Sequence, residues 1–175
     1  MSIANFHPND LLAILPELAL VVLAGVIMTM DVILAENRKR LLGLTMAVGS
    51  FAIIAVAVIF SQPNGELIWG GMIHNDMAAF IFRLVFIFAG AITALLSVDV
   101  KDVAHKGDYY AIMLGAVVGM CFMALAADII MLYLAVETTG IAGYVLAGYA
   151  HRSSRSAEAG LKYFLFGAAT SAVML

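Results

Sequence analysis

The apolar residues of the chain fall into six long runs separated by short polar connectors. Each run is close to the roughly 20 residues that a helix needs to cross the hydrocarbon core of a bilayer. The runs cover about 16–35, 41–61, 78–98, 109–127, 129–149 and 157–175. This pattern predicts an all-α integral membrane protein, a polytopic bundle of about six transmembrane helices that forms a single membrane domain over 1–175.

The second connector, QPNGELIWGGMIHND, has a different pattern, because two short apolar runs flank Gly70 and Gly71. A Gly-Gly pair in that position can close a tight hairpin. We therefore predict a small β-hairpin on the membrane surface, with Trp69 in the interfacial aromatic belt. Asp76 or Asn75 is placed to cap the helix that follows.

Two local patterns predict how the fourth and fifth helices meet. Asp128 interrupts the apolar sequence directly before Ile129 and is most simply the N-cap of the fifth helix. The connection is then so short that the two helices must be antiparallel neighbours. Gly115 and Gly119 form a G-x-x-x-G pattern, which permits close packing of helices in a membrane.

Composition supports the membrane assignment and excludes several function classes. The 175 residues are 64% hydrophobic and 12% charged, with mean hydropathy +1.04. The net charge of −3 is spread thinly without a basic run, so nucleic acid is not an expected partner. Cys121 is the only cysteine and is expected in the apolar core, which excludes a disulfide framework or a Cys-ligated cluster. Since no nucleotide-binding glycine motif or flavin site can be read, we expect this chain to bind no cofactor or metal.

The basic residues of the connectors predict the orientation in the membrane. They occur in the first, third and fifth connectors, whereas the second and fourth contain none. They are Arg38, Lys39, Arg40, Lys101, Lys106, Arg152 and Arg155. The positive-inside rule places these connectors in the cytoplasm and the N-terminus outside.

Several charged residues lie near the ends of the apolar runs. If the first helix starts with its apolar run, Glu17 lies at the interface; a helix begun earlier and capped by Asp10 would place it about 10 Å deep. Asp31 and Glu36, at the other end of this run, are expected to be solvated. Arg83 also lies about 10 Å deep. It can snorkel to the headgroups or form a structural ion pair, with a role in ion movement as the alternative.

The most informative ionisable residue is Glu137, in the middle of the fifth run. A charge near the centre of a membrane helix costs about 2.5–3.5 kcal/mol even on lenient scales, so it needs a partner, water or a function. Small or hydroxylated residues share its face of the helix within about 60°. That face contains Tyr133, Gly140, Ile141, Tyr144, Gly148 and His151. Such a face can line a hydrated seam, so we interpret Glu137 as part of a proton path; a structural carboxyl is the alternative.

Lys162, in the sixth run, has two interpretations. It lies roughly 9 Å inside the cytoplasmic end, and Glu158 is its i−4 neighbour, so a helix-surface ion pair explains it as well as a function does. Glu137 lies near 20 Å from the same boundary if the two helices are neighbours. Direct contact between Glu137 and Lys162 is therefore not expected, and water or further residues would have to bridge them.

Two segments also carry a resemblance to a known family. The runs LYLAVETTGIAGYVLAGY and SAEAGLKYFLFGAATS resemble the antiporter-like subunits of proton-pumping NADH:quinone oxidoreductase, the bacterial respiratory complex I, and most closely subunit N. The resemblance extends from Pro16 to the end of the chain, and its most specific part runs from the Glu to the KYF motif. It implies that Glu137 and Lys162 belong to a proton-translocating channel.

The resemblance further implies the cellular context. Other membrane-arm subunits would be the partners, in the inner (plasma) membrane of a bacterium, and NADH, FMN, iron–sulfur clusters and quinone would be bound by partner subunits. Members of the family are built from inverted repeats with broken helices. Since the chain stops within an apolar run, we expect it to be part of a longer protein, with further lysines of the proton relay beyond Leu175.

Two other functions remain open at this stage. Multisubunit cation/proton antiporters use related sequences, so the chain could act as a secondary transporter without redox partners. A purely structural membrane subunit, in which Glu137 and Lys162 serve assembly, is the other possibility.

Overall fold

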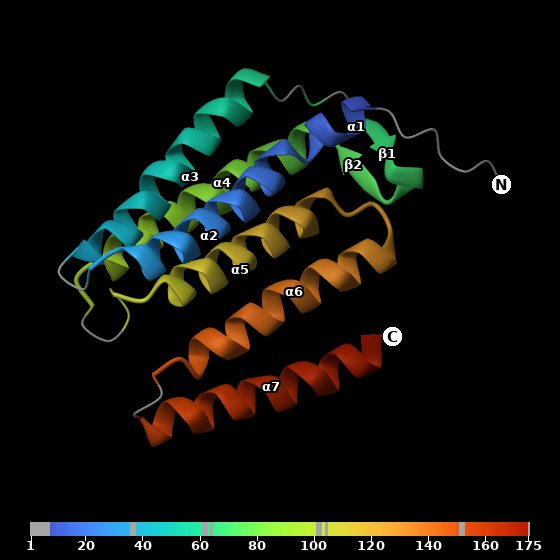
Figure 1. Ribbon diagram of the computed structural model, residues 1–175. Coiled ribbons are helices and arrows are strands. Elements are labelled where there is room, and N and C mark those ends of the chain that lie inside the picture. The colour runs from blue at the N-terminus through green and yellow to red at the C-terminus, as the bar shows by residue number, and fades with distance from the viewer. Residues whose placement is uncertain are drawn as a thin grey trace.

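The computed structural model describes residues 8–35, 38–60, 63, 65–100, 103, 105–150 and 153–174. Its helices lie roughly alongside one another, with α6 beside α5 and α7 beside α6 at the edge (Figure 1). They are α1 (Pro8–Ala13), α2 (Leu15–Ile33), α3 (Arg40–Phe60), α4 (Met77–Ser97), α5 (Gly107–Leu125), α6 (Ile129–Ala147) and α7 (Ser154–Met174). The long helices begin and end within about one helical turn of the six predicted runs.

Five helices, α2 to α6, are long and apolar enough to cross a membrane, which confirms the predicted all-α membrane fold. The predicted sixth span corresponds to α7, which is 21 residues long. Its first half contains Glu158 and Lys162, which lower its hydropathy. Within the part of the chain that the structure describes, α7 is therefore not among the helices that meet both criteria.

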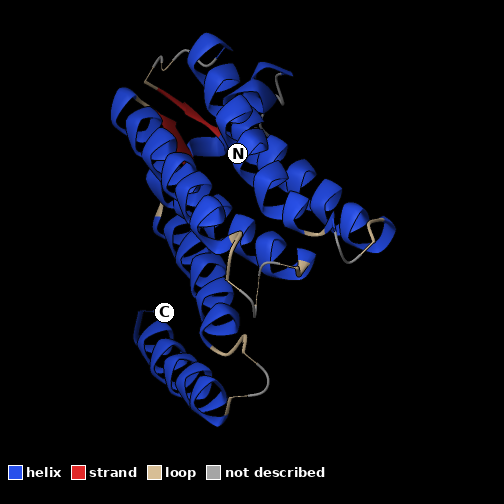
Figure 2. Cartoon of the chain, turned by 90° about the vertical axis from the view of Figure 1, so that its left-hand side faces the viewer, coloured by secondary structure: helices blue, strands red, loops and turns tan. Residues whose placement is uncertain are grey.

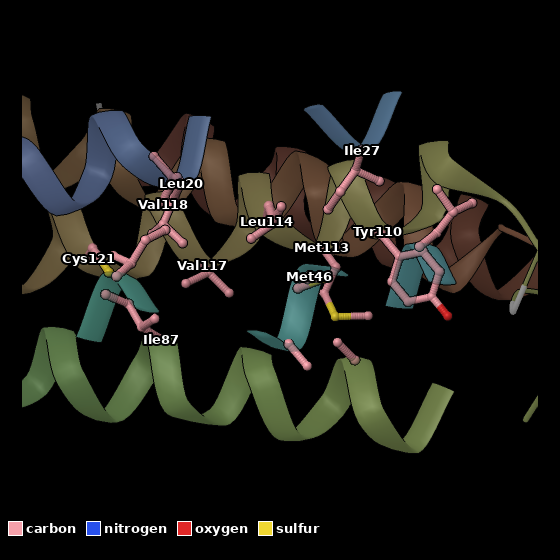
Figure 3. Packing of buried hydrophobic residues seen from close by; sticks show 14 residues of the cluster. Leu20, Ile27, Met46, Ile87, Tyr110, Met113, Leu114, Val117, Val118 and Cys121 are labelled. Carbon is pink, nitrogen blue, oxygen red and sulfur yellow. The ribbon is translucent and has the colours of Figure 1, made fainter. Parts of the chain in front are cut away.

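The apolar core lies between α2, α3, α4 and α5, and α5 contributes the most side chains to it (Figure 3). Apolar side chains from these four helices pack against one another, and such van der Waals contacts stabilise helix association in a membrane. The largest buried ones include Leu20 and Ile27 of α2, Met46 of α3, Ile87 of α4, and Tyr110, Leu114 and Cys121 of α5. The prediction that Cys121 is a core residue is confirmed, since it is fully buried.

By contrast, the two helices at the edge are mostly uncovered. Only Ala135 and Ala142 are buried among the residues of α6, and no described residue of α7 is buried. Figure 2 shows α7 at the margin of the molecule, away from the strands.

The predicted hairpin is present and sits at one end of the bundle (Figure 2). Strands β1 (Glu66–Ile68) and β2 (Ile73–Asn75) pair antiparallel, joined through the short 3₁₀ turn η2 (Trp69–Gly71). Gly70 and Gly71 have φ of 70° and 91°, a left-handed conformation that glycine adopts without steric cost. The Gly-Gly pair is therefore required by the turn, as the sequence pattern indicates.

Main-chain contacts dock the hairpin onto the turn between α5 and α6. Ile73 forms a β-bridge with Ala126, and the N–H of Ala127 donates to the carbonyl of Met72 at 2.9 Å. The hairpin therefore covers the α5–α6 end of the bundle. Trp69 is 40% exposed; its position in the membrane belt stays a prediction.

Both predicted acidic caps are confirmed. The carboxylate of Asp76 accepts from the N–H of Ala79 at 2.7 Å, and that of Asp128 accepts from the N–H of Ile129 at 2.7 Å. Since only residues 126–128 separate α5 from α6, the two helices are antiparallel neighbours, as expected.

The helix ends that border the three connectors with basic residues lie at the end of the bundle opposite the hairpin (Figure 1). There, Arg40 forms an ion pair with Asp99, and the Tyr149 hydroxyl donates to Asp108 at 2.7 Å. This arrangement agrees with the alternation of basic and non-basic connectors. Which end faces the cytoplasm stays a prediction.

Candidate functional site

Helix α6 carries Glu137, and one face of this helix packs tightly on α5. A Cβ built on Gly119 of α5 would lie only 2.4 Å from Oγ1 of Thr139 and 3.1 Å from the carbonyl oxygen of Ala135. Glycine at this position therefore allows close backbone contact, as the G-x-x-x-G pattern predicts. Gly115 does not contribute in this way, since a Cβ there would meet no described atom within 4 Å.

The opposite face of α6 contacts α7 through an aromatic cluster. The Tyr144 ring packs edge-on against Tyr163 and Phe164, with centroid distances of 4.8 and 5.8 Å. It also lies over Gly167, where a built Cβ would overlap the phenol. Nearer the connector, a Cβ on Gly160 would lie 2.9 Å from Cα of Gly148. Aromatic packing and glycine contacts thus hold α7 on α6.

Glu137 lies on the α7 face of α6. It precedes Tyr144 by two turns and is only about 20° from it around the helix. The side chain is partly buried, and its Oε1 atom is buried without a hydrogen-bond partner among the described residues. One carboxyl oxygen of Glu137 thus lacks the hydrogen-bond partner that a buried polar atom normally has.

The polar stripe predicted around Glu137 therefore coincides with the α6–α7 contact. An open groove of about 430 Å³ runs along this contact and is lined by Tyr144, Val145, Gly148, Ala157, Gly160, Leu161 and Phe164. Ile141, also on the predicted stripe, is 56% exposed. His151 lies outside the described residues. The lining is mainly apolar, with the Tyr144 hydroxyl as its polar group.

Lys162 lies on the other side of α7. Its Nζ pairs with Oε1 of Glu158 at 2.6 Å, and both side chains are about two-thirds exposed. The partly buried positions of α7 that face α6 include Gly160 and Gly167. Lys162 is about 200° around the helix from Gly160, so it points away from α6. The structure thus does not bring Lys162 and Glu137 together, as their separation along the helices predicts.

A second ionisable pair, not foreseen as a pair from the sequence, lies inside the bundle. Arg83 of α4 donates from Nε to Oε1 and from Nη2 to Oε2 of Glu17 on α2, both at 2.7 Å. The side chains are 2% and 1% exposed. Such a two-bond arrangement is the strong form of an ion pair. Of the interpretations left open for Arg83, the structural ion pair is confirmed.

The side chain of Glu17 is therefore buried within the protein, although it lies in the first turn of α2, as the later helix start predicts; its depth in the membrane stays a prediction. Helix α1 begins at Pro8, and the chain breaks helical geometry at Ile14 before α2 continues. Arg83 Nη2 also donates to the carbonyl oxygen of Ala13 at 3.0 Å. The alternative from the sequence, a longer helix capped by Asp10, is not observed, because Asp10 lies within α1 and α2 begins separately at Leu15. The side chain of Asp10, the cap in that alternative, lies outside the described residues.

A polar cluster also forms at the end with the basic connectors. Asp31, expected to be solvated, is only partly exposed; it pairs with Lys39 at 3.3 Å and packs against Gly107. The expectation that Asp31 is solvated is therefore corrected, because α5 partly covers its side chain. Glu36 lies outside the described residues. Nearby, burial and the hydrogen bond to Asp108 raise the pKa of the Tyr149 phenol. These contacts join the ends of α2, α5 and α6.

Among the residues with described positions, no group of three His, Cys, Asp or Glu side chains is arranged to hold a metal ion. The ionisable side chains of the spanning helices are carboxylates and cations that can take up or release protons or stabilise one another. The fold and these residues define a polytopic helical membrane protein with a few ionisable groups on its spanning helices.

Comparison with known proteins shows which family this chain resembles. Residues 126–175 match the family described as NADH:quinone oxidoreductase/Mrp antiporter, TM. The match includes all of α6 and α7 and therefore both Glu137 and Lys162. The chain is similar to NADH-quinone oxidoreductase subunit N of Anaeromyxobacter sp. (strain Fw109-5), with 32% identity over 91% of this chain and 32% of that protein.

Other relatives agree. Subunit N 1 of Roseiflexus castenholzii is 34% identical over 98% of this chain and 38% of its own length, and NAD(P)H-quinone oxidoreductase subunit 2 of Nostoc punctiforme is 34% identical over 93% and 31%. The predicted resemblance to subunit N is confirmed. The chain spans about a third of the length of the curated relatives that it matches.

Proposed function

We propose that this chain is part of a membrane-arm subunit of a proton-pumping NADH:quinone oxidoreductase. It would move protons across the inner membrane of a bacterium beside other membrane-arm subunits. NADH, FMN, iron–sulfur clusters and quinone would be bound by partner subunits, so the chain would act in an enzyme complex without redox chemistry of its own. The observation that carries this proposal is Glu137, a carboxyl on a spanning helix with a buried, unpartnered oxygen.

Electrostatic coupling is the mechanism that these features favour. A change of charge elsewhere in the complex would shift the affinity of Glu137 for a proton, since no cation among the described residues pairs with it. Access of water from alternate sides would convert that shift into net transport. Because Lys162 faces away from α6, it would exchange protons with Glu137 through water or other residues and not directly.

Replacement of Glu137 by Gln tests the proposal, because the amide keeps the shape of the side chain but cannot take up a proton. The full-length protein is assembled into membranes, and NADH:quinone turnover and proton pumping are measured on the sample used to quantify assembly. We expect normal assembly with a fall in both coupled rates. Glu66→Gln, which removes a carboxyl from the exposed strand β1, is the matched control.

If the assembled Glu137→Gln complex oxidises NADH and pumps normally, the carboxyl is structural and the proposal fails. If Glu137→Gln prevents assembly and Glu66→Gln does not, the result supports the alternative that Glu137 has a structural role in assembly.

Lys162 is tested separately, since its surface pair with Glu158 explains its position without any function. Lys162→Gln should reduce pumping in assembled complexes if the ammonium belongs to the proton path. Glu158→Gln breaks the same ion pair while it keeps the lysine, and it should reduce pumping less. If the two variants reduce pumping equally, the ion pair between Lys162 and Glu158 is what is needed, and Lys162 is not itself part of the proton path.

A cation/proton antiporter without redox partners is the second candidate, because the matching family description covers both kinds of protein. Transport by purified protein in vesicles distinguishes them. Sodium-dependent proton movement in the absence of NADH and quinone would favour the antiporter.

A further inference from the structure

Arg83 has more hydrogen-bond donors than its protein partners accept. A guanidinium carries five N–H groups. The Nε donor and the two on Nη2 bind Glu17 Oε1, Glu17 Oε2 and the carbonyl of Ala13. The Nη1 atom, which carries the other two, is buried and has no acceptor among the described residues. Since the side chain is 2% exposed, bulk solvent does not supply one.

The chemistry of the pair defines what can bind Nη1. Buried donors in native structures are nearly always paired, with protein or with ordered water. An anion is disfavoured, because Glu17 already neutralises Arg83 and an added negative charge would be left uncompensated in an apolar bundle. Carbonyl groups within the neighbouring helices are engaged in their own helical bonds. The acceptor must therefore be small and neutral.

We propose that Arg83 Nη1 binds a buried water molecule between α2, α4 and α5, so that the Glu17–Arg83 pair is an internal hydrated site. The break in helical geometry at Ile14 lies beside this pair, and irregular backbone at membrane depth occurs where protein or water satisfies its polar groups. The site is separate from Glu137, which lies on the far side of α5, and it does not depend on the proposed function.

The chain contains its own reporter of this water. Cys121 of α5 is the only cysteine of these 175 residues, is fully buried, and belongs to the same core cluster as Leu20 and Ile87, which lie one helical turn from Glu17 and Arg83. X-ray radiolysis of a bound water generates a hydroxyl radical in place, and this radical oxidises adjacent sulfur. Met46 of α3 is equally buried within the apolar core and serves as a dry reference of similar reactivity.

The experiment is radiolytic footprinting of the full-length protein in its membrane complex, read by mass spectrometry. Each oxidation rate is divided by the rate for the same residue in denatured protein. We expect Cys121 to be oxidised several-fold faster than Met46. In the double variant Glu17→Met with Arg83→Met, the rate at Cys121 should fall to that of Met46. The variant replaces the pair by apolar side chains of similar length, a change that buried ion pairs often tolerate.

Three results would overturn the proposal. Cys121 could be as protected as Met46 in the natural protein, its oxidation could persist in the double variant, or a maleimide could label it in the intact complex, which would indicate bulk solvent. If the double variant does not assemble, the ratio of Cys121 to Met46 in the natural protein decides the question.

Discussion

Removal of one partner of the Glu17–Arg83 pair should destabilise the protein far more than removal of both. Arg83→Met leaves a buried carboxylate 1% exposed, without its two hydrogen bonds. Breaking a buried pair in this way costs about 3–5 kcal/mol, whereas replacing both partners by apolar residues is often neutral. For a cooperative unit of 150–250 residues, each kcal/mol shifts the unfolding temperature by roughly 2–4 °C. The single variant should therefore unfold on the order of 10 °C lower.

Cys121 provides the assay, since it is fully buried in the core that the pair borders. Solubilised complexes are heated in steps, treated with a maleimide, and this chain is resolved by mass. The temperature at which Cys121 becomes reactive reports local unfolding. We expect a large drop for Arg83→Met and for Glu17→Met, and recovery in the double variant. If the double variant is as unstable as the singles, or Arg83→Met unfolds at the natural temperature, the pair does not contribute in the way argued.

Other substitutions test contacts between helices with the same assay. Gly119→Ala should lower the unfolding temperature, because the added methyl would meet the backbone of α6, while Gly115→Ala has open space and should be neutral or slightly stabilising. Tyr149→Phe should cost about 1 kcal/mol, through the lost hydrogen bond to Asp108. Burial raises the pKa of Tyr149, so the contribution of this residue to stability is complete below the ordinary phenol pKa of about 10 and is lost at higher pH. The stability of Tyr149→Phe should therefore fall less at alkaline pH than that of the natural protein. Gly160→Leu should detach α7 from α6 and raise protease sensitivity of the α6–α7 connector, with no change in the unfolding temperature of the core.

The spans, the hairpin and the caps were predictable because each depends on residues close together in sequence. An apolar run of the right length specifies a membrane helix wherever it packs. The Gly70-Gly71 turn and the carboxylates of Asp76 and Asp128 act on backbone within a few residues of themselves. These elements are therefore determined by interactions between residues close together in the sequence, which can be read from the sequence directly.

The Glu17–Arg83 pair could not be found in that way. Its partners lie 66 positions apart, and each has an ordinary local explanation, as an acid in a first helical turn and as a snorkelling arginine. The one useful signal was that both residues lie at similar depth near the same end of their helices. Helix periodicity gives depth and face, but it does not say which helices meet, so the pair required the structure. For Glu137, by contrast, periodicity identified the polar face of the helix, and the structure shows that α7 packs against that face.

The two membrane carboxyls illustrate why a charge in a spanning helix does not by itself indicate function. Glu17 has a cation with two hydrogen bonds to it, so removing or adding a proton there would break a well-formed internal pair. Glu137 has a buried oxygen with no partner among the described residues, on the face of α6 that is turned away from α5 and toward α7. Proton uptake or release at Glu137 would therefore break no ion pair among the described residues. The carboxyl that the protein satisfies least is, for this physical reason, the better candidate for a group that changes its protonation state during function.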